Sequence, residues 1–311
     1  MLKFQPSGFG QKWAQGRLGK IAYYTPVALP WPVGKEIDAG TDAKKRTTVI
    51  FFHNFGGGAS AYEWSKVYAA LAANYTVIAP DLIGWGASSH PARRYTSQDY
   101  ISSIETFIEQ VASEPIVGVA SSLTAGLVIR LAVEKPHLFQ RLFLTCPSGF
   151  RDFGEGAGRR IPEPIINTPF LESVIYAIGA TNEIAVRNFL ENFLFAKRDR
   201  LSNEIVSAYL TSAQQPNAEY AALSFLRGDL YFDLAPYIEQ LQIPTAMVWG
   251  ENAQFTSVIS GRRLANLNPY TVRRFQVVSN TGVLPHLEQP GVVTALLLDW
   301  LQASINREES T

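Results

Sequence analysis

The feature that most constrains the fold is a regular alternation of strand-type and helix-type segments. Short β-branched and aromatic runs, each closed by a turn signal, alternate with segments whose apolar residues recur with a helical period. The predicted strands are residues 47–52, 75–79, 116–120 and 141–146, and the predicted helices between them are residues 64–71, 97–111 and 124–134. Strands separated by helices of this length imply right-handed crossovers and a mostly parallel sheet covered on both faces.

The strand rhythm stops between residues 151 and 233, where apolar spacing and scattered prolines predict helices. These helices are residues 171–178, 184–194, 205–210 and 218–226. Strand-type runs return at residues 245–249 and 272–278, followed by a last helix at residues 290–303. The sequence therefore predicts an α/β core in residues 1–150 and 234–311, with residues 151–233 inserted as a helical block.

Charge and metal-ligand spacing exclude several functions. Lys plus Arg and Asp plus Glu each total 27, so no net field attracts nucleic acid, and we expect no nucleic-acid partner. Four scattered histidines and one cysteine offer no metal-ligand spacing. Gly56-Gly57-Gly58 lacks the following Lys-Ser/Thr of a phosphate loop and departs from the dinucleotide fingerprint. We expect neither a metal nor another cofactor.

The ends and apolar runs of the chain bear on location. The first twenty residues lack a seven-residue apolar stretch, and no segment reaches the roughly 18 apolar residues needed to cross a bilayer. The sequence predicts a cytoplasmic protein without a transmembrane segment and leaves peripheral membrane contact open.

The candidate nucleophile is Ser122, in the segment Ala120-Ser121-Ser122-Leu123-Thr124 between a predicted strand and a predicted helix. A sharp strand-to-helix turn needs small flanking residues and pushes its central side chain into the open. A second loop, residues 53–57, follows the strand that should lie beside this turn. We expect the backbone N–H groups of Phe55 and Leu123 to form an oxyanion hole there.

Five ordered motifs carry a family resemblance. They are HNFGGG at 53–58, APDLIGWGAS at 79–88, ASSLT at 120–124, PTAMVWGE at 244–251 and GVLPHLEQP at 282–290. Over roughly residues 45–150 and 236–300 the chain resembles the α/β-hydrolase superfamily, specifically the capped group of epoxide hydrolases, haloalkane dehalogenases and small esterases. The resemblance implies an eight-stranded-type, mostly parallel sheet flanked by helices, with residues 151–233 as a helical cap over the site.

The same resemblance implies that the catalytic triad is degenerate. Relatives read Trp-Gly-Glu-x-Asp after the seventh strand, where this chain has Ala253. They read Gly-His-x-Pro-His before the last helix, where this chain has Val283. A serine hydroxyl is a poor nucleophile without a base, and losing the triad leaves only about 10³- to 10⁴-fold catalysis over water.

Two residues could stand in for the missing acid and base. His286 lies three residues beyond Val283 and is the candidate base, although relatives often hold a packing histidine there. Asp152, just past the predicted sixth strand, lies where some capped relatives supply their acid, and its alternative role is a hinge or capping residue.

Two functions follow from these residues. The first is a serine-type hydrolase of an ester or acyl bond in a small apolar substrate, using Ser122 with His286 and Asp152. The second is a catalytically inactive homologue that binds a small apolar ligand between core and cap. The retained serine and oxyanion loop favour the first by a narrow margin. A cofactor-free lyase is less favoured, because it too normally needs the missing histidine.

Overall fold

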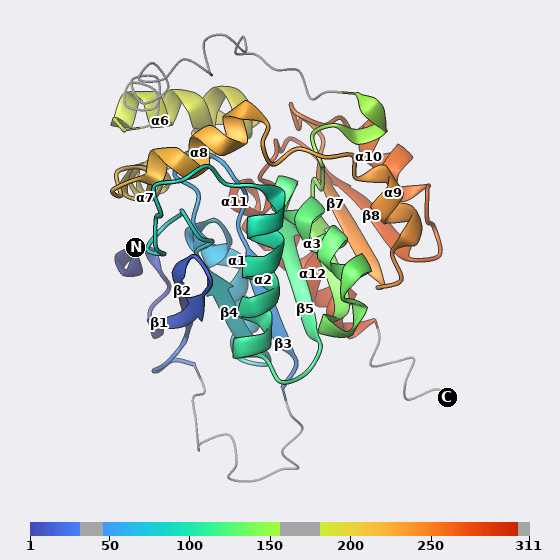
Figure 1. Ribbon diagram of the computed structural model, residues 1–311, viewed down its shortest axis with the longest axis horizontal. Helices are drawn as coiled ribbons and strands as arrows, with labels where there is room; N and C mark the ends of the chain where they lie inside the picture. Colours follow the sequence, from blue (N-terminus) through green and yellow to red (C-terminus); the bar gives the residue numbers. More distant parts are fainter. Residues whose placement is uncertain (32–45, 156–180, 304–311) are drawn as a thin grey trace.

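The computed structural model describes residues 1–31, 46–155 and 181–303. Its centre is an eight-stranded sheet with the order β1-β2-β4-β3-β5-β6-β7-β8 (Figure 1). The six parallel strands are β3 (Thr48–Phe52), β4 (Thr76–Pro80), β5 (Ile116–Ser121), β6 (Phe139–Thr145), β7 (Thr245–Gly250) and β8 (Val272–Val278). The predicted fold class, a mostly parallel α/β sheet flanked by helices, is confirmed.

The other two strands form an N-terminal hairpin that the sequence analysis did not predict. Strands β1 (Phe9–Gly16) and β2 (Gly19–Pro26) pair antiparallel, and β2 adds antiparallel to β4 through Tyr23 and Tyr24. Only some side chains of the hairpin, such as Ile21 and Tyr24, are buried; the others are partly or fully exposed, and Trp13 is half exposed. Because one face is solvated, no continuous apolar run marks these strands in the sequence.

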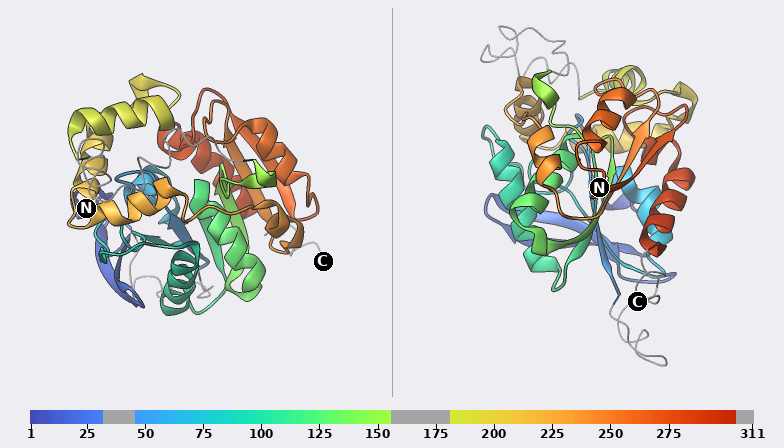
Figure 2. Two further views of the ribbon diagram at one scale, coloured as in Figure 1. Left: turned by 45° about the horizontal axis from the view of Figure 1, so that its top comes forward. Right: turned by 90° about the vertical axis from the view of Figure 1, so that its right-hand side faces the viewer.

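Helices cover both faces of the sheet (Figure 2). Residues alternate between the faces along each strand. Ile50 and Phe52 of β3 join one core cluster, whereas Val49 and Phe51 join the other. The first cluster includes residues of α2 (Ser97–Val111), α3 (Ser122–Glu134), α9 (Ala235–Gln240) and α10 (Val258–Ala265), and the second includes residues of α1 (Ser65–Leu71) and α12 (Pro290–Gln302).

A third apolar cluster joins the first helices of the 181–233 segment to the core, whereas the last helix, which carries Ala218 and Ala221, packs in the first cluster. This segment contains α6 (Glu183–Phe189), a π-helical turn (Leu190–Leu194), α7 (Asn203–Ala213) and α8 (Ala218–Arg227). They match the helices predicted at 184–194, 205–210 and 218–226, whereas the helix predicted at 171–178 lies outside the described residues. Leu194 and Tyr209 pack in one cluster with Val283 and Leu284, so this block is built onto the loop after β8.

Within residues 1–31, 46–155 and 181–303, none of the helices is long and apolar enough to span a membrane.

Candidate active site

Ser122 sits on a sharp turn at the carboxyl end of β5, where the sequence placed it. Strand β5 ends at Ser121 and α3 begins at Ser122, whose φ of 53° lies in the left-handed region that non-glycine residues rarely adopt. The loop after β6 holds this turn, because Ser148 N–H donates to the Ser122 carbonyl at 3.3 Å. Ser122 is 8% exposed, and no hydrogen bond among the described residues engages its hydroxyl.

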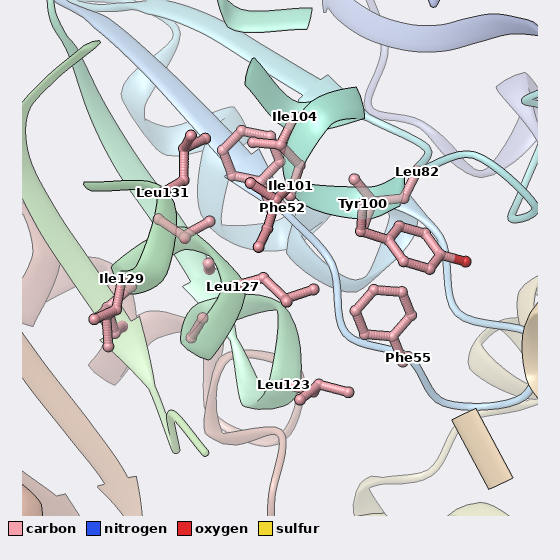
Figure 3. Packing of buried hydrophobic residues seen from close by; sticks show 14 of the residues in the cluster. Phe52, Phe55, Leu82, Tyr100, Ile101, Ile104, Leu123, Leu127, Ile129 and Leu131 are labelled. Carbon is pink, nitrogen blue, oxygen red and sulfur yellow. The ribbon is translucent and has the colours of Figure 1, made fainter. Parts of the chain in front are cut away.

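Two backbone donors are available next to this turn. Leu123 is the second residue of α3, so its N–H has no partner within the helix. Phe55 lies on the loop after β3, and in the described part of the chain neither its N–H nor that of Leu123 donates a hydrogen bond. Both residues belong to one core cluster, where the Phe55 ring lies 4.5 Å from that of Tyr100 (Figure 3). In the described structure both N–H groups are thus free to donate, and the oxyanion hole stays a prediction.

The acid and base positions lie on two loops that contact each other. Asn252 N–H donates to the Thr281 carbonyl at 2.8 Å, and a Cβ on Gly250 would overlap the Gly282 carbonyl oxygen. The loops after β7 and β8 therefore bring positions 253 and 283 to one region. Ala253 is partly buried and Val283 is 4% exposed, and both pack in the same apolar cluster.

His286 is held by other partners. Its ring stacks on Trp64 with centroids 3.7 Å apart and planes at 12°, and its Nδ1 lies 3.3 Å from Thr145 Oγ1. Its Nε2 is buried and has no hydrogen-bond partner in the described structure. Full burial lowers the pKa of His286 to about 3, so the ring is neutral at pH 7. These contacts fit the packing alternative better than the base.

The loop that carries Val283 is fastened to the segment between the π-helical turn and α7. Val283 N–H donates to the Leu194 carbonyl at 3.0 Å. Glu288 accepts from the N–H groups of Gly282, Ala196 and Lys197, the last two at 3.0 and 3.2 Å. Because backbone bonds hold the loop on both sides, it is poorly placed to swing a side chain toward Ser122.

Asp152 accepts hydrogen bonds from its own loop and from the segment before α9. Its Oδ1 accepts from Gly149 N–H at 2.9 Å and Leu234 N–H at 3.1 Å, and its Oδ2 accepts from Ser148 Oγ at 2.7 Å. Burial raises the pKa of this carboxyl, while these three donors lower it. The geometry fits the capping alternative, in which Asp152 ties the loop after β6 to the segment before α9.

Sequence reasoning missed a buried acid beside the loop that carries Phe55. Glu63 is fully buried, and its Oε2 accepts from Asn54 N–H at 3.0 Å while its Oε1 accepts from the Tyr209 hydroxyl at 2.6 Å. Burial raises the pKa of Glu63 to about 7, although both bonds lower it. The available signal was an acidic residue between Tyr62 and Trp64 in an otherwise apolar turn.

Aromatic rings connect the core loops to the helical segment beside the site. The Phe150 ring lies 5.0 Å from Tyr231, 5.4 Å from Phe225 and 5.9 Å from Phe255. Phe255, two residues past Ala253, stacks in turn with Phe193 at 6.4 Å. The region where relatives place polar acid and base groups is therefore bordered by aromatic surface.

Metal-ligating side chains do not gather at this site. In the three described stretches of chain, no group of three or more His, Cys, Asp or Glu side chains is placed to hold a metal ion.

The sheet order and the strained serine turn define a protein of the α/β-hydrolase fold. Residues 49–296 match the model of the alpha/beta hydrolase family, and the chain belongs to that family.

Individual relatives are distant. The chain is 22% identical over 286 residues to the (lyso)-N-acylphosphatidylethanolamine lipase of Mus musculus, covering 84% of this chain and 81% of the lipase. It is 25% identical over 261 residues to the uncharacterized hydrolase YugF of Bacillus subtilis (strain 168), covering 83% and 90%.

Solved structures agree on the fold. A serine hydrolase involved in carbazole degradation, the CarC enzyme, superposes with a TM-score of 0.72 at 17% identity, covering 95% of this chain and 99% of that one. The epoxide hydrolase CorEH superposes with a TM-score of 0.72 at 18% identity, covering 95% of this chain and 99% of the epoxide hydrolase.

Proposed function

We propose that this protein binds a small apolar molecule carrying a carbonyl-type oxygen, and that it has lost hydrolysis by a serine triad. The proposal rests on the lack, among the described residues, of a residue placed to act as a base for Ser122. Position 283 is a buried valine, and His286 stacks on Trp64 instead of pairing with Ser122. The inactive homologue therefore becomes the better supported of the two functions.

Acid–base chemistry supports the loss of hydrolysis. A general base works best when its pKa lies near the operating pH. Because burial lowers the pKa of His286 to about 3, its ring is too weak a base to take the Ser122 proton efficiently at pH 7. Asp152 could not compensate without giving up hydrogen bonds that hold its own loop.

The remaining groups suit recognition of an oxygen on an apolar body. The N–H groups of Phe55 and Leu123 and the hydroxyl of Ser122 can all donate to a carbonyl or carboxylate oxygen. Aromatic side chains such as Phe255 and Phe225 offer surface to the rest of the molecule. In this proposal residues 151–233 form the cap over the ligand, in a cytoplasmic protein that needs no cofactor.

Ligand binding is tested by thermal stabilisation with fatty acids, their methyl esters and aryl carboxylic acids. A ligand at 100 times its Kd is expected to raise the free energy of unfolding by about 2.7 kcal/mol. Alkanes of matched length serve as controls, since they fill apolar space but offer no oxygen to the donors. Recovery of unchanged ester after incubation supports binding without hydrolysis. Equal stabilisation by alkane and acid, or by none of them, would contradict the proposal.

The second candidate function is a serine hydrolase that uses Ser122 with an unconventional base such as His286. The retained strained turn and the two unpaired N–H groups favour it, since hydrolysis needs both. Relatives that match across most of the chain include a lipase and a protein named as a hydrolase. Reactivity of Ser122 separates the two candidates.

A further inference from the structure

Helix α7 rests on the loop that carries the oxyanion donor. The Tyr209 hydroxyl donates to Glu63 at 2.6 Å. Ser212 Oγ donates to the Ala59 carbonyl at 3.0 Å and accepts from Gly86 N–H at 3.0 Å. At Gly58, with a φ of +85°, a Cβ would overlap the Tyr209 carbonyl oxygen, so the two backbones touch. The helix therefore meets residues 58–63 at several points.

Glu63 connects this contact to Phe55. Its second oxygen accepts from Asn54 N–H at 3.0 Å, and the Asn54 side chain in turn accepts from Gly56 N–H. The residues on both sides of Phe55 are therefore held by hydrogen bonds, one directly from Glu63 and the other through Asn54. The peptide unit between them, which carries the Phe55 N–H, is held by His53, whose Nδ1 lies 2.7 Å from the Asn54 carbonyl oxygen.

We propose that Glu63 is a positioning residue that transmits the docking of α7 to the loop that carries Phe55, so that the peptide units on either side of the Phe55 N–H keep their positions only while Tyr209 holds Glu63. The coupling between α7 and residues 54–56 rests on the hydrogen bonds of Tyr209, Glu63 and Asn54 alone. Only the interpretation of Phe55 as an oxygen donor rests on the proposed function.

A carboxylate suits this position because it accepts from both sides at once. Above its pKa of about 7 the Glu63 carboxyl is ionised and has only acceptor sites, so the Tyr209 hydroxyl and the Asn54 N–H can both donate to it. Hydrogen bonds to an ionised group are shorter and stronger than neutral ones. Because Glu63 is fully buried, removing either donor leaves a costly charge with one partner fewer.

The coupling is tested by hydrogen–deuterium exchange in a peptide covering residues 53–58, without any ligand. Tyr209→Phe removes only the hydroxyl that bonds Glu63, and it should speed exchange in this peptide about tenfold or more. Tyr62→Phe is the matched control, because its hydroxyl donates at 2.7 Å to Glu204 of α7 and also joins the core to that helix. We expect Tyr62→Phe to leave residues 53–58 protected as in the wild type.

Glu63→Gln keeps the experiment decisive if Tyr209→Phe loosens α7 itself. The amide keeps the shape, but its nitrogen can only donate, so the bond to Tyr209 must reverse and both bonds lose the charge of an ionised acceptor; residues 53–58 should therefore exchange faster while residues 203–213 stay protected. Wild-type exchange of residues 53–58 in both Tyr209→Phe and Glu63→Gln would overturn the coupling. Because no ligand is used, that result would leave ligand binding untouched, and failed binding with intact coupling would count against the proposed function alone.

Discussion

Introducing Ala253→Asp and Val283→His together is expected to raise turnover of a small activated ester by about 10²- to 10⁴-fold, the usual contribution of general-base catalysis. The strained turn at Ser122 is formed, and the N–H groups of Phe55 and Leu123, the proposed oxyanion donors, make no hydrogen bond in the described part of the chain. The loops that carry the two positions are joined by the bond from Asn252 N–H to the Thr281 carbonyl. A new imidazole and carboxylate would therefore start from neighbouring, fixed backbone positions.

Each single substitution should give less than the pair. A histidine without its orienting acid samples the wrong tautomer, and an acid without a base orients nothing. Position 283 is 4% exposed in an apolar cluster, so an unpaired polar group there should cost about 1–3 kcal/mol of stability. Ester turnover and thermal melts are measured on all variants, with Ser122→Ala added to the double variant as the control. A folded double variant with unchanged rate would show that the missing pair is not the limiting defect.

The stability of the wild type relative to Glu63→Gln should depend on pH. Burial raises the pKa of Glu63 from its ordinary 4.5 to about 7, so between these values the folded protein keeps a proton that the unfolded chain has released. Raising the pH through this window therefore favours unfolding. The free energy of unfolding of the wild type should fall by about 3 kcal/mol relative to that of the variant across this window. Above pH 7 the difference between the two proteins should stay constant.

The comparison with Glu63→Gln isolates this residue from other buried groups. Burial lowers the pKa of His53 to about 4 and that of His286 to about 3, which makes their contribution to stability increase with pH. Both histidines are present in both proteins and cancel in the difference. Urea denaturation from pH 4.5 to 8 measures the difference in free energy of unfolding between the wild type and Glu63→Gln. Glu204→Gln is the matched control, because Glu204 is an exposed carboxylate that accepts from the Tyr62 hydroxyl. A difference that stays constant across this range would refute the assignment.

Local sequence patterns predicted the parts of the fold that local structure determines. The buried strand, tight turn and helix around Ser122 lie within twenty residues, so periodicity and small flanking residues were sufficient. The β1–β2 hairpin was not predicted, because exposed residues interrupt the apolar pattern of its strands. Helices on the 181–233 segment were predicted from their apolar spacing, but not the contacts that α7 makes with the oxyanion loop.

Long-range contacts surround the residues whose roles the sequence left open. His286 is neutral because it is fully buried, and Trp64, far earlier in the chain, stacks on its ring. Asp152 acts in loop capping because Leu234 N–H, 82 positions away, donates to it. Glu63 meets Tyr209 across 146 positions. None of these pairings leaves a signal in a single sequence, because each is specified by the packing of separate elements.

The reactivity of Ser122 separates a binding protein that has lost hydrolysis from a working serine hydrolase. Intact-mass analysis follows labelling by a fluorophosphonate probe in the wild type, in Ser122→Ala and in the Ala253→Asp/Val283→His variant, with a serine esterase of complete triad in the same tube. The account predicts that the wild type gains no more adduct than Ser122→Ala while the esterase is fully labelled, and that the double variant gains one adduct. A wild type that gains one adduct as fast as the esterase, and loses it in Ser122→Ala, would contradict the account and establish a working serine hydrolase.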